Sequence, residues 1–182
     1  MNKNSDRKKI AFEFILLFGL ISALGDITYE GARSVYGNYL GFLGAGALTI
    51  GLVTGFGEFL GYSIRFISGY FIDKTGNSWI VTILGYAMLI SVPLLAIAGN
   101  WQIAALFIIL ERIGKAVRSP GKDTMLSHAT KHIGTGVGFG ISEALDQIGA
   151  IIGPLLFTMA LTYMGGYKQG FKFMWIPAIL AI

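Results

Sequence analysis

GYFIDKTGN, residues 69–77, is a short polar stretch that closes one long apolar run, residues 45–71, and precedes another, residues 79–98. A connection this short between two runs that can each cross a bilayer joins antiparallel helices. Gly76 permits the reversal of the backbone, because a residue without a Cβ adopts positive φ at little steric cost. The two charged residues of the stretch lie where the chain leaves the lipid, at a depth that tolerates charge. The stretch therefore predicts a helical hairpin that crosses a membrane twice.

The composition places the chain among membrane proteins. Hydrophobic residues make up 54% of its 182 residues, 26 residues are glycine, and the mean hydropathy is +0.66, which is more apolar than a soluble domain of this size. The sequence contains no cysteine, which excludes disulfides, thiolate catalysis and cysteine-ligated metals. The net charge of +4 comes from basic residues in the polar connections rather than along one amphipathic surface, so no nucleic-acid partner is expected.

Motifs of ATP-driven pumps and of membrane hydrolases are missing from the sequence. It has no Walker loop, no nucleophile elbow and no His-Glu-x-x-His motif. His128 and His132 are spaced i, i+4 in the expected polar loop between the fourth and fifth spans, but no third ligand lies near them in the sequence. We therefore expect no enzyme activity, no cofactor and no metal site.

Stretches of mostly apolar residues predict the membrane spans. A helix needs about 20 such residues to cross the ~30 Å hydrocarbon layer. A sixth stretch stops at Ile182 before it is long enough to cross, so we expect residues 1–182 to be a truncated bundle. The predicted spans are residues 10–29, 45–71, 79–98, 101–118 and 136–163, with a partial span at 171–182.

Lysine and arginine predict the orientation. A cytoplasmic N-terminus puts most of these residues inside and only Lys168 and Lys172 in an outer loop, which agrees with the positive-inside rule. We therefore expect a multi-pass protein of the cell (inner) membrane. The residues placed inside are Lys3, Arg7, Lys8, Lys9, Lys74, Arg118, Lys122 and Lys131.

Ionisable residues inside the first two spans need an explanation, because a charge at the bilayer centre costs about 2.5 to 3.5 kcal/mol on the mildest scale. In the first span, Asp26, Glu30 and Arg33 follow each other at i, i+4 and i+7, which places them on one helical face. Glu58 and Arg65 repeat part of that pattern in the second span. Two such stripes predict a polar seam or cavity. The alternative is that the first-span charges lie in the headgroup layer and that Arg65 extends towards water.

The fourth and fifth spans carry further charges. Glu111 and Lys115 are spaced i, i+4 and can pair on one helix, which leaves Arg112 in need of another partner. Glu143 and Asp146 at i, i+3 place two acids on the fifth span. Because neighbouring like charges away from water raise the proton affinity of one acid, the two could carry a proton. The alternative is an Asp146 that is hydrogen-bonded to another helix.

Glycine pairs spaced i, i+4 predict where helices approach closely, because they remove side chains from one stripe of the helix. The alternative is that glycine is simply frequent in membrane helices. The pairs are Gly51 with Gly55, Gly57 with Gly61, and Gly149 with Gly153.

The turn after the second span resembles the signature between the second and third helices of the major facilitator superfamily. Gly69, Asp73, Lys74 and Gly76 match it, whereas an asparagine and a serine stand where the family has two further basic residues. The resemblance implies that these four residues form a gating motif at the cytoplasmic face.

Two further elements resemble the superfamily in the expected order along the chain. Gly149, Gly153 and Pro154 are similar to the G-x-x-x-G-P element in the fifth helix of its drug and proton antiporters, without the glycine pair that follows there, and the resemblance implies that they too serve gating. Arg112 matches the arginine of the family's fourth helix, which is linked in exporters with proton coupling, but Ala116 occupies the accompanying glycine position. The alternative is a structural arginine that pairs with other residues to hold helices together.

The resemblance implies an all-α integral membrane fold, the N-terminal six-helix half of a major facilitator transporter, built from two inverted three-helix repeats with the sixth helix incomplete. It implies secondary active transport of a small solute by alternating access, proton-coupled export, and a second six-helix bundle as partner. The alternative is a non-transporting half-transporter module that serves as a scaffold or sensor. The residues expected to line the substrate and proton pathway are Asp26, Glu30, Arg33, Glu58, Arg65, Arg112, Glu143 and Asp146.

Overall fold

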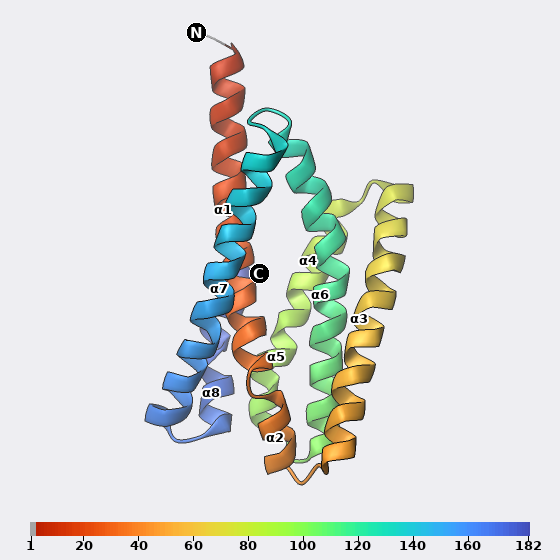
Figure 1. Ribbon diagram of the computed structural model, residues 1–182, viewed down its shortest axis with the longest axis vertical. Helices are drawn as coiled ribbons and strands as arrows, with labels where there is room; N and C mark the ends of the chain where they lie inside the picture. Colours follow the sequence, from red (N-terminus) through yellow and green to blue (C-terminus); the bar gives the residue numbers. More distant parts are fainter. Residues whose placement is uncertain (1–2) are drawn as a thin grey trace.

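The computed structural model describes residues 3–182, in which every regular element is a helix (Figure 1). The long helices lie side by side, so that segments far apart in the sequence are neighbours. The first two residues of the predicted 1–182 bundle lie outside the described residues. The elements are α1 (Lys3–Arg33), α2 (Tyr36–Phe42), α3 (Ala47–Thr75), α4 (Ser78–Ala87), η1 (Met88–Ile90), α5 (Ser91–Leu94), η2 (Leu95–Ile97), α6 (Trp101–Thr130), α7 (Thr135–Met164), α8 (Tyr167–Phe173) and α9 (Trp175–Ala181).

Length and apolar composition identify the helices that can cross a membrane. In the part of the chain that the structure describes, four helical segments meet both conditions: Asp6–Arg33, Ala47–Thr75, Ser78–Ile97 and Thr135–Met164. Large apolar side chains on these segments, such as Leu52, are exposed on the outside of the bundle rather than buried within it. Such a surface is suited to lipid, and the chain is therefore an all-helical membrane protein.

The α3–α4 turn has the predicted geometry. Helix α3 ends at Thr75, and Gly76 adopts φ +71° while its N–H donates to the carbonyl of Ile72 at 2.8 Å. Helix α4 begins two residues later, at Ser78. The left-handed glycine closes α3 and reverses the chain, so the predicted helical hairpin is confirmed.

The fourth predicted span is part of a much longer helix. Helix α6 starts at Trp101, where the side chain of Asn100 caps it by accepting from the N–H of Ile103 at 2.9 Å, and it continues through Pro120 to Thr130. Helix α6 therefore extends beyond the predicted span, residues 101–118, and it is not among the four described segments that meet both conditions for crossing a membrane. His128 lies on α6 rather than in a polar loop.

Helices α1 and α7 pack backbone against backbone, and glycine makes this contact possible. A Cβ added to Gly31 of α1 would lie 2.8 Å from the carbonyl oxygen of Gly153 of α7. Gly149, one turn earlier on α7, faces the backbone of Ala23 in the same way. The backbones of the two helices touch along this line, as the third glycine pair predicted.

The two glycine pairs of α3 behave differently. Among the described residues, a Cβ added at Gly51, Gly55 or Gly61 would have no atom within 4 Å, and one at Gly57 would meet only the side chain of Arg112. The prediction of close helix packing at these pairs was wrong for the part of the chain described. Helix α3 lies at the edge of the bundle, beside α6 (Figure 1).

A buried aromatic cluster ties the short helices to the long ones. The ring of Phe171 on α8 lies 4.8 Å from that of Tyr39 on α2 and 4.9 Å from that of Phe157 on α7, measured between centroids. The hydroxyl of Tyr39 donates to the carbonyl of Leu95 at 2.8 Å. This cluster packs α2, α7 and α8 together at one end of the bundle.

Candidate functional site

A charged groove runs between α1, α3, α6 and α7. It consists of two adjoining cavities of about 190 Å³ and about 500 Å³, which share Arg65, Lys115 and Ser119 in their walls. Within residues 3–182, six cationic and six acidic side chains line the two cavities. The cations are Arg33, Arg65, Arg112, Lys115, Arg118 and Lys122, and the acids are Asp26, Glu30, Glu58, Asp123, Glu143 and Asp146.

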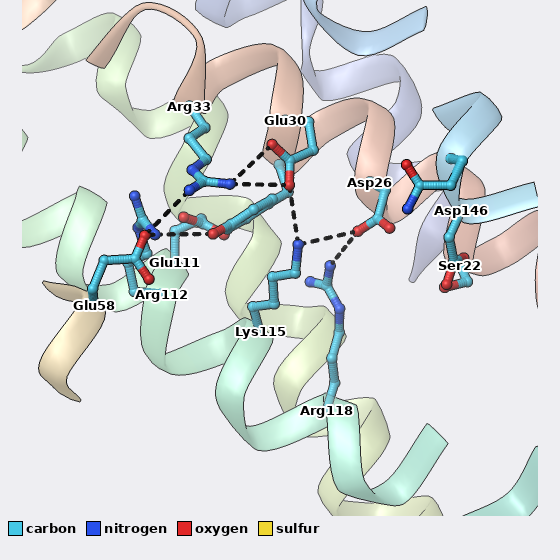
Figure 2. A network of polar contacts seen from close by, with 12 residues as sticks. Ser22, Asp26, Glu30, Arg33, Glu58, Glu111, Arg112, Lys115, Arg118 and Asp146 are labelled. Carbon is cyan, nitrogen blue, oxygen red and sulfur yellow. Dashed lines mark hydrogen bonds and ion pairs between the residues drawn. The ribbon is translucent and has the colours of Figure 1, made fainter. Parts of the chain in front are cut away.

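Ion pairs between α1 and α6 form a ladder along the groove (Figure 2). Lys115 Nζ lies 3.3 Å from Glu30 Oε1 and 3.7 Å from Asp26 Oδ1, and Arg118 lies 3.4 Å from the same Asp26 oxygen. The acids of α1 recur every four residues and the bases of α6 every three, so both sets stay on the facing sides of their helices. The acids of this stripe on α1 therefore face α6.

Glu58 connects α3 to this ladder. Its Oε1 pairs with Arg112 of α6 and also lies 3.4 Å from Arg33 of α1, so one carboxylate holds guanidinium groups from two other helices (Figure 2). Arg112 is only 6% exposed, and it also donates to the hydroxyl of Tyr29 at 3.0 Å. Arg112 therefore finds its partners on two other helices, Glu58 on α3 and Tyr29 on α1.

The predicted pair of Glu111 with Lys115 was wrong. Glu111 is 1% exposed and accepts a hydrogen bond from the hydroxyl of Tyr36 at 3.4 Å, while Lys115 extends towards α1. Lys115 Nζ also lies 3.5 Å from the centre of the Tyr29 ring, within the range of a cation–π interaction. Cross-helix partners replace the local i, i+4 pair.

A second ion pair links α6 to α7. Lys122 pairs with Asp146 and donates to the hydroxyl of Ser22 on α1 at 2.8 Å. Glu143 points elsewhere, since it accepts from the side chain of Gln147 at 2.7 Å and is exposed. The two acids of α7 therefore line the same larger cavity with different partners, and Asp146 has the interhelical partner that the alternative interpretation gave it.

Sequence reasoning missed several residues of the groove. Lys115, Arg118 and Lys122 continue the stripe of Arg112 along α6, and this helical spacing could have identified them.

Arg65 lines both cavities, yet within the described residues it forms no ion pair at 4.0 Å or less.

The residues of the two motifs lie outside the groove walls. Asp73, Lys74 and Gly76 are exposed at the α3–α4 turn, whereas a Cβ at Gly69 would contact Pro120 of α6 at 3.8 Å. In the second motif, Gly149 and Gly153 face α1 and form part of the α1–α7 contact, and Pro154 lies inside α7.

The described residues offer no metal site. No group of three or more histidine, aspartate or glutamate side chains that could hold an ion occurs within residues 3–182, and the chain has no cysteine. His128 and His132 are exposed at the end of α6 and in the following turn.

The fold and the groove define a class: a helical membrane protein with charged side chains gathered between its helices. Among curated proteins, the chain is similar to an uncharacterised protein of Mycobacterium tuberculosis strain H37Rv, with 47% identity over 156 residues, 85% of this chain and 38% of the relative. It is also similar to an uncharacterised MFS-type transporter of Methanocaldococcus jannaschii, with 32% identity over 165 residues, 90% of this chain and 41% of the relative. The chain thus spans about two fifths of the length of the curated relatives it matches. No protein-family profile and no solved structure matches.

Proposed function

We propose that this chain is the N-terminal six-helix half of a major facilitator transporter, which moves a small solute across the membrane by alternating access. The motif at residues 69–76, the arginine at Arg112 and the G-x-x-x-G-P element at residues 149–154 support the family, and so does the similarity to an MFS-type transporter. The observation that carries the proposal is the groove. Charged side chains from four helices line two adjoining cavities inside a membrane protein, where isolated charges are costly.

In this proposal the groove is completed by a partner. A second six-helix bundle opposite this half would cover the groove, and the rocking of one bundle against the other would open it to each side of the membrane in turn. The second bundle is supplied by further sequence, by a second copy or by a separate subunit. The bundle lies in the cell membrane with its N-terminus in the cytoplasm.

Transport is driven by the proton gradient in this proposal. Asp26, Glu30, Glu58 and Asp146 all lie in the groove and all face a cation from another helix. Protonation of an acid breaks its ion pair, so proton binding changes which helices hold together. Export then follows if the solute leaves as the proton enters, as the resemblance to drug and proton antiporters implies.

Proteoliposomes with a trapped pH-sensitive dye test the proposal, because they report coupled transport before the solute is identified. Candidate solutes added to vesicles that contain the protein should cause a proton flux, and an imposed pH gradient should drive their uptake. Glu58→Gln and Asp146→Asn should each reduce the coupled flux at least tenfold. Glu13→Gln, which removes an acid whose side chain is 58% exposed and outside the groove, should leave the flux unchanged.

Three results would count against the proposal in different ways. A solute that crosses the membrane with no response to the pH gradient would leave a transporter with another driving force. A flux unaffected by both groove variants would show that the coupling acid lies elsewhere. Solute binding without any flux, in vesicles that also contain the second bundle, would favour the non-transporting sensor or scaffold.

A further inference from the structure

The two cavities of the groove differ in charge. Among the described residues, the smaller cavity is lined by four cationic side chains and one carboxylate, that of Glu58. The larger cavity has four cations and five acids in its walls. The groove is therefore close to neutral as a whole but polarised along its length, with its positive end at the smaller cavity. The four cations of that end are Arg33, Arg65, Arg112 and Lys115.

The acids around the positive end do not fully neutralise it. Glu30 and Asp26 are shared between Arg33, Lys115 and the neighbouring α6 arginine, and Glu58 divides its charge between two guanidinium groups. Arg65 has no ion pair within the described residues.

Hydrogen-bonding capacity at the positive end is also left over. The Nε of Arg112 is buried and, within residues 3–182, has no hydrogen-bond partner. The hydroxyls of Tyr29, Tyr62 and Ser119 line the same cavity. The walls thus offer cationic donors and hydroxyls in excess over acceptors, which is the composition that binds an oxyanion.

We propose that the smaller cavity binds the anionic group of a small organic solute, a carboxylate or a phosphate. The inference rests on the proposed function, because it assigns a substrate class to the same groove. Glu58 then acts as an internal competitor: its carboxylate occupies the guanidinium groups of Arg33 and Arg112 when no solute is bound, and the anion of the solute replaces it. Arg65 is available to the anion from the start.

The sizes of the two cavities indicate where the rest of the solute lies. About 190 Å³ holds an anionic group and a few further atoms, and the cavity adjoins the larger one of about 500 Å³ at Arg65, Lys115 and Ser119. A solute that is anionic at one end therefore places its remaining part beside the acids Asp26 and Asp146, where hydroxyl or amino groups find acceptors.

Binding measurements on the purified protein in detergent test this assignment with three probes of nearly equal shape. Isothermal titration calorimetry should show that benzoate binds and that benzylamine and benzyl alcohol bind at least tenfold more weakly. Inorganic phosphate should compete with benzoate, which identifies the anionic group as the part recognised. Equal binding of benzylamine and benzoate would overturn the proposal.

Two variants locate the site. Arg65→Gln should weaken benzoate binding on the order of tenfold, and it leaves the ion pairs of the ladder intact. Glu58→Gln should strengthen binding on the order of tenfold, because it frees two guanidinium groups. Arg7→Gln and Glu13→Gln are the matched controls, since both residues are exposed on α1 outside the groove, and they should not change the affinity. Unchanged affinity in Arg65→Gln would refute the assignment even if Glu58→Gln failed to fold.

The outcome is separable from that of the proposed function. Benzoate binding with the predicted variant pattern but no flux of any solute in proteoliposomes would support the anion site and refute the transporter. Proton-coupled flux of cationic or neutral solutes that benzoate and phosphate do not inhibit would support the transporter and refute the anion site.

Discussion

Gly153→Ala should destabilise the protein through a single added methyl group. The Cβ of an alanine at this position would lie 2.5 Å from the carbonyl oxygen of Ile27, 2.8 Å from the backbone nitrogen of Gly31 and 3.0 Å from the Cα of Ile27. Ordinary contacts of a Cβ lie between 3.4 and 4 Å, so α1 and α7 must separate by several tenths of an ångström or more. The neighbouring atoms belong to the backbone of α1, and no change of side-chain rotamer can remove the conflict.

The magnitude follows from two opposing terms. Overpacking in a tight contact costs about 1 to 3 kcal/mol. Replacing glycine by alanine inside a helix returns up to about 1 kcal/mol of helix propensity. Gly55→Ala provides the matched control: it makes the same replacement inside α3, and within the described chain its Cβ has no neighbour within 4 Å. The propensity term cancels between the two variants, and their difference measures the cost of the α1–α7 contact alone.

Thermal unfolding in detergent, followed by the far-UV circular dichroism of the helices, measures that difference. For a chain of this length, 1 kcal/mol corresponds to about 2 to 4 °C in Tm, so Gly153→Ala should melt about 2 to 12 °C below Gly55→Ala. Gly55→Ala itself should match or slightly exceed the wild-type protein. Equal melting temperatures in the two variants would show that α1 and α7 do not touch backbone to backbone, and the geometry of the groove that rests on this contact would have to be revised.

Two further predictions test the orientation and the pairing of the bundle. Because the chain has no native cysteine, Asp6→Cys and Asn77→Cys should resist an impermeant thiol reagent applied outside intact cells, whereas Lys168→Cys should react; the reverse labelling would invert the topology. Lys122→Gln should lower the free energy of unfolding by about 3 to 5 kcal/mol, because it leaves the carboxylate of Asp146 buried without its partner. Adding Asp146→Asn to this variant should recover part of the loss. If the effects of the two substitutions simply add, the two residues do not interact.

Local chemistry made the α3–α4 turn predictable. The polar residues of the turn and Gly76 act within a few residues of one another, and the left-handed cap depends on nothing outside them. The apolar runs before and after the turn likewise identified α3 and the segment Ser78–Ile97, which begins with α4, as long and apolar enough to cross a membrane. In these cases the sequence contains both the element and its cause.

The length of α6 was not predictable in the same way. Hydropathy estimates how much of a helix the lipid covers, whereas the helix itself continues as long as its side chains find packing partners. Gly121, Met125 and Leu126 are buried beyond the predicted end at residue 118, and their packing against the rest of the bundle extends α6 to Thr130. Tertiary contacts decided the end of this helix.

Partner choice is the other property that a single sequence leaves open. The stripes on α1 and α3 were visible as spacings, but spacing does not say which stripe faces which. Glu111 and Lys115 have the spacing of an ion pair and do not form one, because Glu30 on another helix is nearer to Lys115. The spacing of the glycine pairs likewise does not identify their neighbours, since Gly153 contacts a partner helix and Gly55 contacts none among the described residues.

The ladder also indicates where movement of the bundle has its energetic cost. A displacement of α3 relative to α6 would separate Glu58 from Arg112 and Arg33, whereas the pairs between α1 and α6 would be kept. Each charge left without a partner at the bilayer centre costs about 2.5 to 3.5 kcal/mol on the mildest scale. Separation is therefore opposed unless another anion takes the place of the Glu58 carboxylate or a proton neutralises it. In a transporter of the proposed kind, solute and proton would then act at one residue, and α3 would be free to move only when one of them is bound.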